Sequence, residues 1–244
     1  MAQKTIYKDS VSQQQVDFRN NLSIPGIINS VLSVAGKDAE SKGFGVEFLN
    51  TKNYSWALSR FAIEIYKAPA MGENFSTTTW ISDASRVLST RNFVVKDESC
   101  NEILAAAISQ WCIIDLTART AVDFSKLGID YNSHICNFDS PIARVKKLRG
   151  ITPQASTQHK ATYSNIDFNR HVNTIKYIEM MLDMLPLELI ERSKSLRVDL
   201  HFISECRYGN TLTVALQQVE NCSNFEITKE DGSCAVKGCF EWVN

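Results

Sequence analysis

The sequence lacks the segments that direct a chain into or across a membrane. Its first 20 residues contain no apolar run of the kind that forms the core of a signal peptide. Its apolar runs, such as residues 104–108, are far shorter than the ~20 residues that cross a bilayer. Its seven cysteines are odd in number and none are spaced as C-x-x-C, so we expect reduced thiols. These absences predict a cytoplasmic protein without membrane insertion.

Several kinds of functional site are also missing. The 26 basic and 27 acidic residues nearly cancel, and a net charge of −1 argues against nucleic acid as the main partner. The four histidines, at positions 134, 159, 171 and 201, form no H-x-x-x-H or similar ligand set, so we expect no metal. There is no glycine-rich phosphate loop, and we expect no cofactor. The absence of G-x-S-x-G excludes an α/β-hydrolase.

The first half of the chain begins with the pattern of a long helix. Residues 24–41 carry apolar side chains at helical spacing, Ser23 is a suitable N-cap, and Pro25 fits the first turn. Gly43 follows the end of the pattern. Alternating apolar residues then predict strands at residues 61–65, 75–81, 92–96 and 103–118.

The second half repeats this order. Residues 172–185 place apolar side chains on one helix face, and Pro186 is expected to stop the helix. Strands are predicted at residues 196–202, 211–219, 225–229 and 234–243, with a hairpin turn at Asp231-Gly232. A local match supports a duplication, because Asp17-Phe18 precedes the first helix and Asp167-Phe168 precedes the second.

One long helix with an antiparallel sheet wrapped around it is the hotdog arrangement. A sheet with one apolar face must cover that face, and a helix of about five turns does so. Two such units that pair edge to edge into one sheet would also remove two exposed edges. The sequence therefore predicts an α+β double hotdog with sheets joined into one: an N-terminal hotdog at residues 1–131, a linker at 132–158 and a C-terminal hotdog at 159–244.

Polar residues alternate just before the second helix, at Asp167, Asn169 and His171. In an extended segment they would point the same way. Histidine titrates near neutrality and can take a proton from water, and a carboxylate such as Glu205 can orient its ring. Unpaired N–H groups at the helix N-terminus could hold the oxyanion of an attacked carbonyl. Taken singly, Asp167 or Asn169 could instead cap the helix, and His171 could be structural.

Two segments of the second half resemble a known family. Residues 163–179, YSNIDFNRHVNTIKYIE, resemble the signature of the acyl-ACP thioesterases of plant plastids and bacteria, and residues 203–207, ISECR, resemble the family's Glu-Cys pair. The first half is similar to the family's substrate-binding hotdog at residues 56–60, 64–72, 79–80 and 109–111. The resemblance covers most of residues 4–243. The chain begins almost at the first strand, which indicates a bacterial form.

The resemblance implies an enzyme that hydrolyses fatty acyl thioesters of acyl carrier protein to free fatty acid and carrier, which ends chain elongation. It implies catalytic roles for Asp167, Asn169, His171 and Glu205. Cys206 is an alternative nucleophile, in a papain-like set with His171 and Asn169, or simply fills space. We favour attack by water, because a cysteine at a strand end has no clear source of a lowered pKa.

The first half carries other residues at the matching positions. The alignment rests on the two Asp-Phe pairs and on the glycine turns at Gly72 and Gly209. The matched pairs are Arg19 with Asn169, Asn21 with His171, Ala68 with Glu205 and Pro69 with Cys206. We therefore expect a catalytic C-terminal hotdog and an N-terminal hotdog that shapes the acyl tunnel.

A basic cluster precedes the catalytic half. Acyl carrier protein resembles a small acidic helical bundle, so basic residues should meet it. Arg144, Lys146, Lys147 and Arg149 form the densest positive cluster in the chain. We predict that this cluster docks the phosphopantetheine-bearing carrier, although a solvated connector would look the same. The enzyme is expected to be a monomer or a homodimer.

Two other functions fit parts of the pattern. A hotdog dehydratase acting on 3-hydroxyacyl chains also uses a histidine and a carboxylate without metal, but its carboxylate must face a β-carbon. A non-catalytic acyl-thioester sensor would carry a separate output module, for which this chain has no room. Product analysis with saturated and hydroxyacyl substrates separates these functions.

Overall fold

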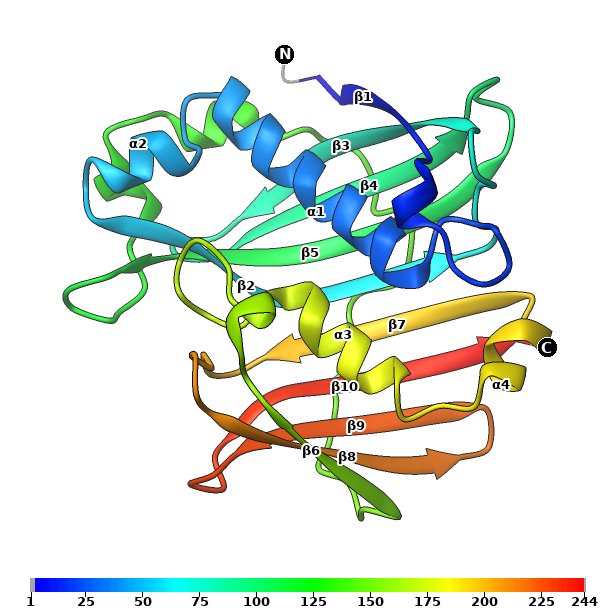
Figure 1. The fold of residues 1–244 in the computed structure, drawn as a ribbon. Coiled ribbons are helices and arrows are strands. Elements are labelled where there is room, and N and C mark those ends of the chain that lie inside the picture. The colour runs from blue at the N-terminus through cyan, green and yellow to red at the C-terminus, as the bar shows by residue number, and fades with distance from the viewer. Residues whose placement is uncertain (1–2, 244) are drawn as a thin grey trace. The chain divides into compact units, whose positions relative to one another are not determined.

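A computed structural model describes residues 3–243, which divide into two units between Val145 and Lys146. Figure 1 shows the fold. The first unit contains β1 (Thr5–Ser10), α1 (Ile24–Ser41), α2 (Val46–Asn50), β2 (Tyr54–Ile65), β3 (Asn74–Ala84), β4 (Ser89–Asp97) and β5 (Ile103–Asp115). The second unit contains β6 (Ala155–Lys160), α3 (Thr174–Leu182), α4 (Leu187–Arg192), β7 (Ser195–Phe202), β8 (Thr211–Val219), β9 (Cys222–Lys229) and β10 (Cys234–Val243).

The two units have the same strand topology. In the first unit the strands are ordered β1-β3-β4-β5-β2, and in the second they are ordered β6-β8-β9-β10-β7, with all of these neighbours antiparallel. In each unit the first long helix, α1 or α3, lies across one face of its own sheet (Figure 1). This confirms the predicted α+β hotdog class.

The helix α1 forms where the sequence predicts it. The side chain of Ser23 accepts a hydrogen bond from the N–H of Gly26 at 3.1 Å, and Pro25 occupies the first turn. Ile28 and Val31 are fully buried against the sheet side of the helix. The helix is therefore fixed both by its cap and by its apolar face.

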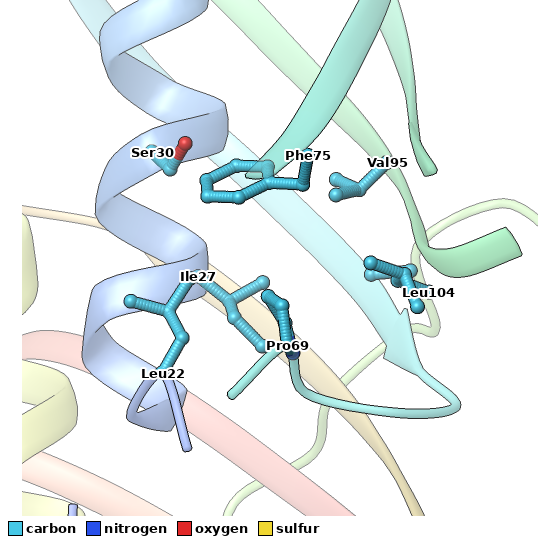
Figure 2. A pocket seen from close by; sticks show the side chains of 8 residues that line it. Leu22, Ile27, Ser30, Pro69, Phe75, Val95 and Leu104 are labelled. Carbon is cyan, nitrogen blue, oxygen red and sulfur yellow. The ribbon is translucent and has the colours of Figure 1, made fainter. Parts of the chain in front are cut away.

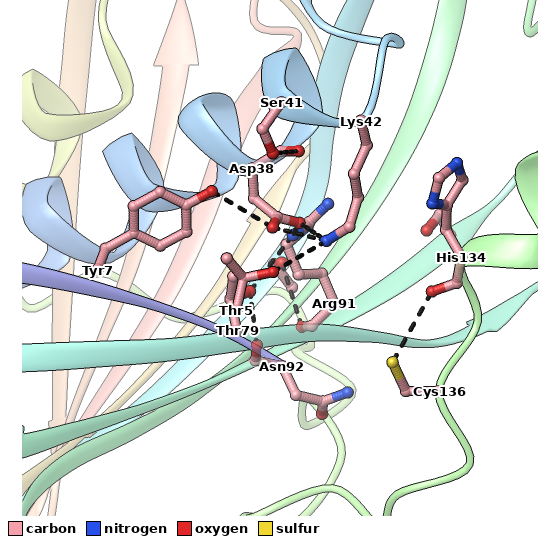
Figure 3. Close-up of polar contacts among 12 residues, drawn as sticks. Thr5, Tyr7, Asp38, Ser41, Lys42, Thr79, Arg91, Asn92, His134 and Cys136 are labelled. Carbon is pink, nitrogen blue, oxygen red and sulfur yellow. Dashed lines mark hydrogen bonds and ion pairs between the residues drawn. The ribbon is translucent and has the colours of Figure 1, made fainter. Parts of the chain in front are cut away.

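A buried ion pair joins α1 to its sheet. The carboxylate of Asp38, on α1, is fully buried and contacts the guanidinium of Arg91, on β4. It also accepts hydrogen bonds from Lys42 at 2.5 Å and from the hydroxyl of Tyr7 at 3.4 Å (Figure 3). Burial alone would raise the pKa of Asp38, but the charge of Arg91 and the hydrogen bonds from Arg91 and Lys42 together outweigh burial, and the pKa is lowered. The carboxylate is therefore held ionised inside the unit.

The second unit departs from the sequence pattern at its helix. The prediction extended this helix over residues 172–185, whereas α3 ends at Leu182 and a turn follows. Pro186 does not stop this helix but is the N-cap of α4, a short helix that the pattern missed. The segment 132–158, predicted as a linker, contains both the boundary between the units and the first residues of β6.

Within residues 3–243, no helix is long and apolar enough to cross a membrane.

Candidate active site

One turn occurs twice, at residues 11–24 and 161–174, with the same secondary structure in both units. The N–H of Asp17 donates to the carbonyl of Asn21 at 2.8 Å, and the N–H of Asp167 donates to the carbonyl of His171 at 2.8 Å. Residue 20 and residue 170 both adopt a φ of 64°. The spacing of 150 residues that links the two Asp-Phe pairs is therefore a structural repeat.

The turn corrects one expectation about the polar residues. Asp167, Asn169 and His171 do not lie along an extended segment, because the chain reverses between residues 167 and 171. The Oδ1 atom of Asp167 accepts hydrogen bonds from the N–H of Asn169 at 2.9 Å and from the N–H of His171 at 3.1 Å. Aspartate commonly stabilises turns in this way. Asp167 therefore fixes the backbone that carries the other two side chains, and Asn169 is exposed.

The structure brings His171 and Glu205 together. The backbone of His171 forms an antiparallel bridge with Arg207, and the N–H of Val172 donates to the carbonyl of Cys206 at 2.8 Å. The Nε2 atom of His171 then lies 3.1 Å from Oε2 of Glu205. The Nη2 atom of Arg207 lies 3.8 Å from the same oxygen. The imidazole is 20% exposed and the carboxylate 38% exposed, so both can reach a substrate.

The helix cap is a residue that the sequence analysis did not identify. Asn173 is the N-cap of α3, and its Oδ1 accepts from the N–H of Ile175 at 2.8 Å. The N–H of Lys176 donates to the carbonyl of Asn173 at 3.0 Å. The two first-turn N–H groups are thus occupied, and the expectation that such groups hold an oxyanion is not met at these positions. The 150-residue repeat could have identified this cap, because Ser23 is its counterpart.

Cys206 is a buried thiol. It has no exposed surface, and burial raises its pKa. A reactive cysteine needs a lowered pKa and access to the substrate, and Cys206 has neither. No group of three His, Cys, Asp or Glu side chains within residues 3–243 could hold a metal ion.

The first unit builds the same turn from other side chains. Asn21 bridges to Ala70, and the N–H of Leu22 donates to the carbonyl of Pro69 at 2.8 Å. Asn21 and Pro69 therefore stand where the second unit has His171 and Cys206. The guanidinium of Arg19, the counterpart of Asn169, lies 2.7 Å from the carboxylate of Asp17. The histidine–glutamate pair of the second unit thus has no counterpart at the matching turn of the first, all of which the structure describes.

Within the basic cluster, Lys146 is anchored by its backbone. The backbone N–H of Lys146 donates to the carboxylate of Asp199 at 2.8 Å, and its carbonyl contacts Nε2 of His201 at 2.8 Å. The ammonium of Lys146 is ion-paired with Glu241. The other three members, Arg144, Lys147 and Arg149, are exposed. The structure therefore gives Lys146 a structural role on the sheet of the second unit.

Comparisons with known proteins point to one family. Residues 3–126 match the family model of the acyl-ACP thioesterase N-terminal domain, and residues 149–244 match that of the C-terminal domain. The chain is 24% identical over 257 residues to the chloroplastic palmitoyl-acyl carrier protein thioesterase of Arabidopsis thaliana, an alignment that covers 96% of this chain and 62% of that protein. The chain thus spans less than two thirds of the length of this relative.

Two solved structures are similar over nearly the whole chain. An acyl-ACP thioesterase from Bacteroides thetaiotaomicron is 31% identical, with a TM-score of 0.88 and coverage of 98% of this chain and 97% of that chain. A 12:0-ACP thioesterase from Umbellularia californica is 19% identical, with a TM-score of 0.82 and coverage of 98% and 96%. At that identity the second likeness speaks for the fold alone.

Proposed function

We propose, from the premise that the chain belongs to the acyl-ACP thioesterase family, that it hydrolyses fatty acyl thioesters of acyl carrier protein. The products are free fatty acid and carrier, so the reaction ends chain elongation. The observation that carries this proposal is the contact of 3.1 Å between Nε2 of His171 and Oε2 of Glu205. It lies in the half that matches the C-terminal family model.

In the proposed mechanism, water attacks the thioester carbonyl with His171 as general base. The contact with Glu205 occupies Nε2 and leaves Nδ1 of the imidazole to take the proton from water. The tetrahedral intermediate then expels the carrier thiolate, which receives that proton from the imidazolium. Glu205 orients the ring and balances its positive charge.

The other site residues have supporting roles in this proposal. Asp167 holds the turn through two backbone N–H groups, so that His171 faces Glu205. The exposed amide of Asn169 can donate to the carbonyl oxygen, or hold the attacking water, without adding charge. Cys206 does not act as a nucleophile, because its thiol is buried and its pKa is raised by that burial.

The proposed partner is acyl carrier protein with its phosphopantetheine-linked acyl chain. Arg144, Lys147 and Arg149 are exposed basic residues that could meet an acidic carrier, with Lys146 anchored between them. The first unit would shape the acyl tunnel. Its support is the set of apolar side chains that pack beneath α1, including Ile27, Phe75 and Leu104 (Figure 2). We place the reaction in the cytoplasm, where the seven free cysteines would stay reduced.

Incubation with a panel of acyl carrier proteins that bear different acyl chains tests the proposal. Release of free fatty acid from saturated acyl carriers is the expected result. Conversion of 3-hydroxyacyl carriers to enoyl products without release of acid would indicate a dehydratase instead. Binding of acyl carriers without turnover would indicate a sensor.

A further inference from the structure

An arginine lies beside the histidine–glutamate pair of the second unit. The backbone of Arg207 forms an antiparallel bridge with that of His171. Its Nη2 atom lies 3.8 Å from Oε2 of Glu205, the oxygen that Nε2 of His171 contacts at 3.1 Å. The side chain of Arg207 is 63% exposed, so a substrate can reach it. A positive charge therefore stands at the edge of the proposed site.

The first unit shows that this turn forms without the guanidinium. Ala70 is the counterpart of Arg207, because each forms the antiparallel bridge with the repeated turn of its own unit. The N–H of Ala70 donates to the side chain of Glu73 at 2.9 Å, and the N–H of Arg207 donates to the side chain of Asn210 at 2.8 Å. The hydrogen bonds that return to the carbonyls of residues 70 and 207 are both 3.1 Å. Alanine therefore supports this backbone as well as arginine does.

The ion pair with Glu205 does not explain the arginine either. A separation of 3.8 Å is too long for a hydrogen bond, and ion pairs between largely exposed groups stabilise a fold only weakly. The guanidinium of Arg207 is therefore better explained by the reaction than by the fold.

Hydrolysis of a thioester places new negative charge beside an existing carboxylate. When water adds to the carbonyl carbon and its proton passes to His171, the carbonyl oxygen becomes an oxyanion. When the carbon–sulfur bond breaks, the imidazolium gives its proton to the departing thiolate, and the imidazole is neutral again. The other product is a carboxylic acid, which loses its proton to solvent near neutral pH. The product carboxylate then lies close to the carboxylate of Glu205, and like charges repel.

The groups already placed at the site do not balance this charge. The N–H groups of Ile175 and Lys176, in the first turn of α3, are occupied by the cap residue Asn173. Asn169 offers an amide without a net charge. Arg207 carries a permanent positive charge and several N–H donors in a plane that matches a carboxylate.

We infer that Arg207 is a further catalytic residue, whose guanidinium contacts the oxyanion formed on the thioester carbonyl and then the carboxylate of the fatty acid product. The inference rests on the proposed function. The phosphate of the carrier is not the ligand of Arg207, because the whole pantetheine chain separates that phosphate from the thioester, whereas Arg207 and His171 lie at the same oxygen of Glu205. The ligand class is the carboxylate head of a fatty acid.

Steady-state kinetics of the full chain with an acyl carrier protein substrate give the first test. Arg207→Ala should lower kcat roughly 10-fold with little change in KM, because the oxyanion forms only after the substrate is bound. Loss of an enclosed oxyanion donor costs ~10²–10³-fold, and an exposed guanidinium should contribute less. Arg207→Lys should recover much of the rate because it keeps the charge, whereas Arg207→Gln should not.

Calorimetric binding of decanoate and decanol gives a second test, which needs no turnover. The two molecules have the same carbon chain, and only decanoate carries a carboxylate. Arg207→Ala should weaken decanoate binding roughly 10-fold and leave decanol binding nearly unchanged. The same selective loss should appear when Arg207→Ala is made in a Glu205→Gln background, because the arginine contacts the ligand itself rather than acting through Glu205.

Arg192→Ala provides a matched control. Arg192 is an exposed arginine of the same unit, on α4, where its Nε donates to the carbonyl of Glu188 at 3.1 Å. Its removal makes the same change in net charge, and both kcat and decanoate affinity should stay near the wild-type values. Equal losses for Arg192→Ala and Arg207→Ala would show an effect of overall charge and overturn the inference.

Other results would overturn the contact between Arg207 and the ligand. A fall in kcat with unchanged decanoate affinity would mean that the arginine acts only through Glu205. Equal losses for decanoate and decanol would mean that it acts on the shape of the site. No measurable decanoate binding by the wild type would also overturn the inference. If Arg207→Ala does not fold, Arg207→Lys and Arg207→Gln carry the test, and equal decanoate affinities in these two variants overturn it.

Two outcomes separate this inference from the proposed function. Wild-type kcat and decanoate affinity in Arg207→Ala, together with an inactive His171→Ala, would sink the role of Arg207 and leave the hydrolase intact. A wild-type protein that releases no acid would sink the proposed function itself, even where decanoate binding still depends on Arg207.

Discussion

Backbone hydrogen bonds set the position of His171, and its imidazole ring supplies its chemistry. The turn is held by the N–H of residue 171, which donates to Asp167, and by the carbonyl of residue 171, which accepts from it. The imidazole contributes a contact with Glu205 but is not fully buried, at 20% exposure. Its removal should therefore disturb the reaction far more than the fold.

We accordingly expect His171→Ala to lower kcat by ~10²–10⁴-fold, the usual contribution of a general base. Thermal unfolding of the variant should stay close to that of the wild type. The pair of measurements is kcat on an acyl carrier protein substrate and the melting temperature. A well-folded variant with near-normal turnover would remove His171 from the mechanism.

At the scale of a structural element, the repeated turn allows effects on stability to be measured apart from effects on activity. Asp167 and Asp17 both accept backbone hydrogen bonds within their turns. Asp167→Ala and Asp17→Ala should therefore each cost on the order of 1 kcal/mol per lost hydrogen bond in unfolding free energy. Only Asp167→Ala should also lower kcat strongly, because only the second turn carries the histidine. Comparable activity losses in the two variants would mean that the turn matters only for stability.

The buried ion pair of α1 is the second element with a measurable consequence. Arg91 and Asp38 are 5% and 0% exposed at their side chains, so Arg91→Leu leaves a carboxylate buried without its main partner. We expect a loss of about 3–5 kcal/mol in unfolding free energy from denaturant titration. Asp38→Leu combined with Arg91→Leu should lose less, because the buried carboxylate is then gone as well. A double variant less stable than the single one would contradict this account.

The same pair gives stability a defined pH dependence. The pKa of Asp38 is lowered in the folded state, because the charge of Arg91 and the hydrogen bonds from Arg91 and Lys42 together outweigh the effect of burial. The unfolded chain therefore binds this proton more readily than the folded chain does. The contribution is complete above the ordinary pKa of an aspartate and is lost as the pH falls through the lowered value.

The sequence predicts the bounds of a helix where local signals such as caps and apolar spacing set them. The bounds of α1 follow from local signals, because Ser23 caps it and its apolar face continues along most of its length. Apolar spacing did not show that α3 ends at Leu182, since Leu185 continues the spacing although residues 183–185 form a turn. Proline disfavours the helical conformation in the residue before it, so Pro186 keeps Leu185 out of the helix but does not set the end at Leu182.

The site also contains residues that local patterns indicate and contacts that only the fold creates. The sequence indicates Asp167 and His171 through their spacing before a helix. The contact between His171 and Glu205 depends on a bridge between segments more than 30 residues apart, which no local pattern encodes. Tertiary contacts of this kind become visible only once the fold is known.

At the scale of the whole molecule, the positive and negative charges nearly cancel, so the binding of a charged partner depends on local clusters of charge. The net charge is −1, so the chain as a whole neither attracts nor repels an acidic carrier strongly. Of the basic cluster, Lys146 is unsuitable for a test, because its reversal would break the ion pair with Glu241. Lys147 and Arg149 are exposed and lie outside the strands, so they can be changed with less structural effect.

We predict that Lys147→Glu combined with Arg149→Glu raises KM for acyl carrier protein substrates and leaves kinetics on a small acyl thioester unchanged. The difference in KM between the wild type and this double variant should shrink with added salt, because exposed charges are screened beyond roughly 10 Å at 0.1 M. Lys52→Glu with Lys126→Glu makes the same change in net charge at exposed positions of the first unit and should have little effect. Equal losses on both substrates, or equal effects of the two double variants, would mean that the carrier docks elsewhere.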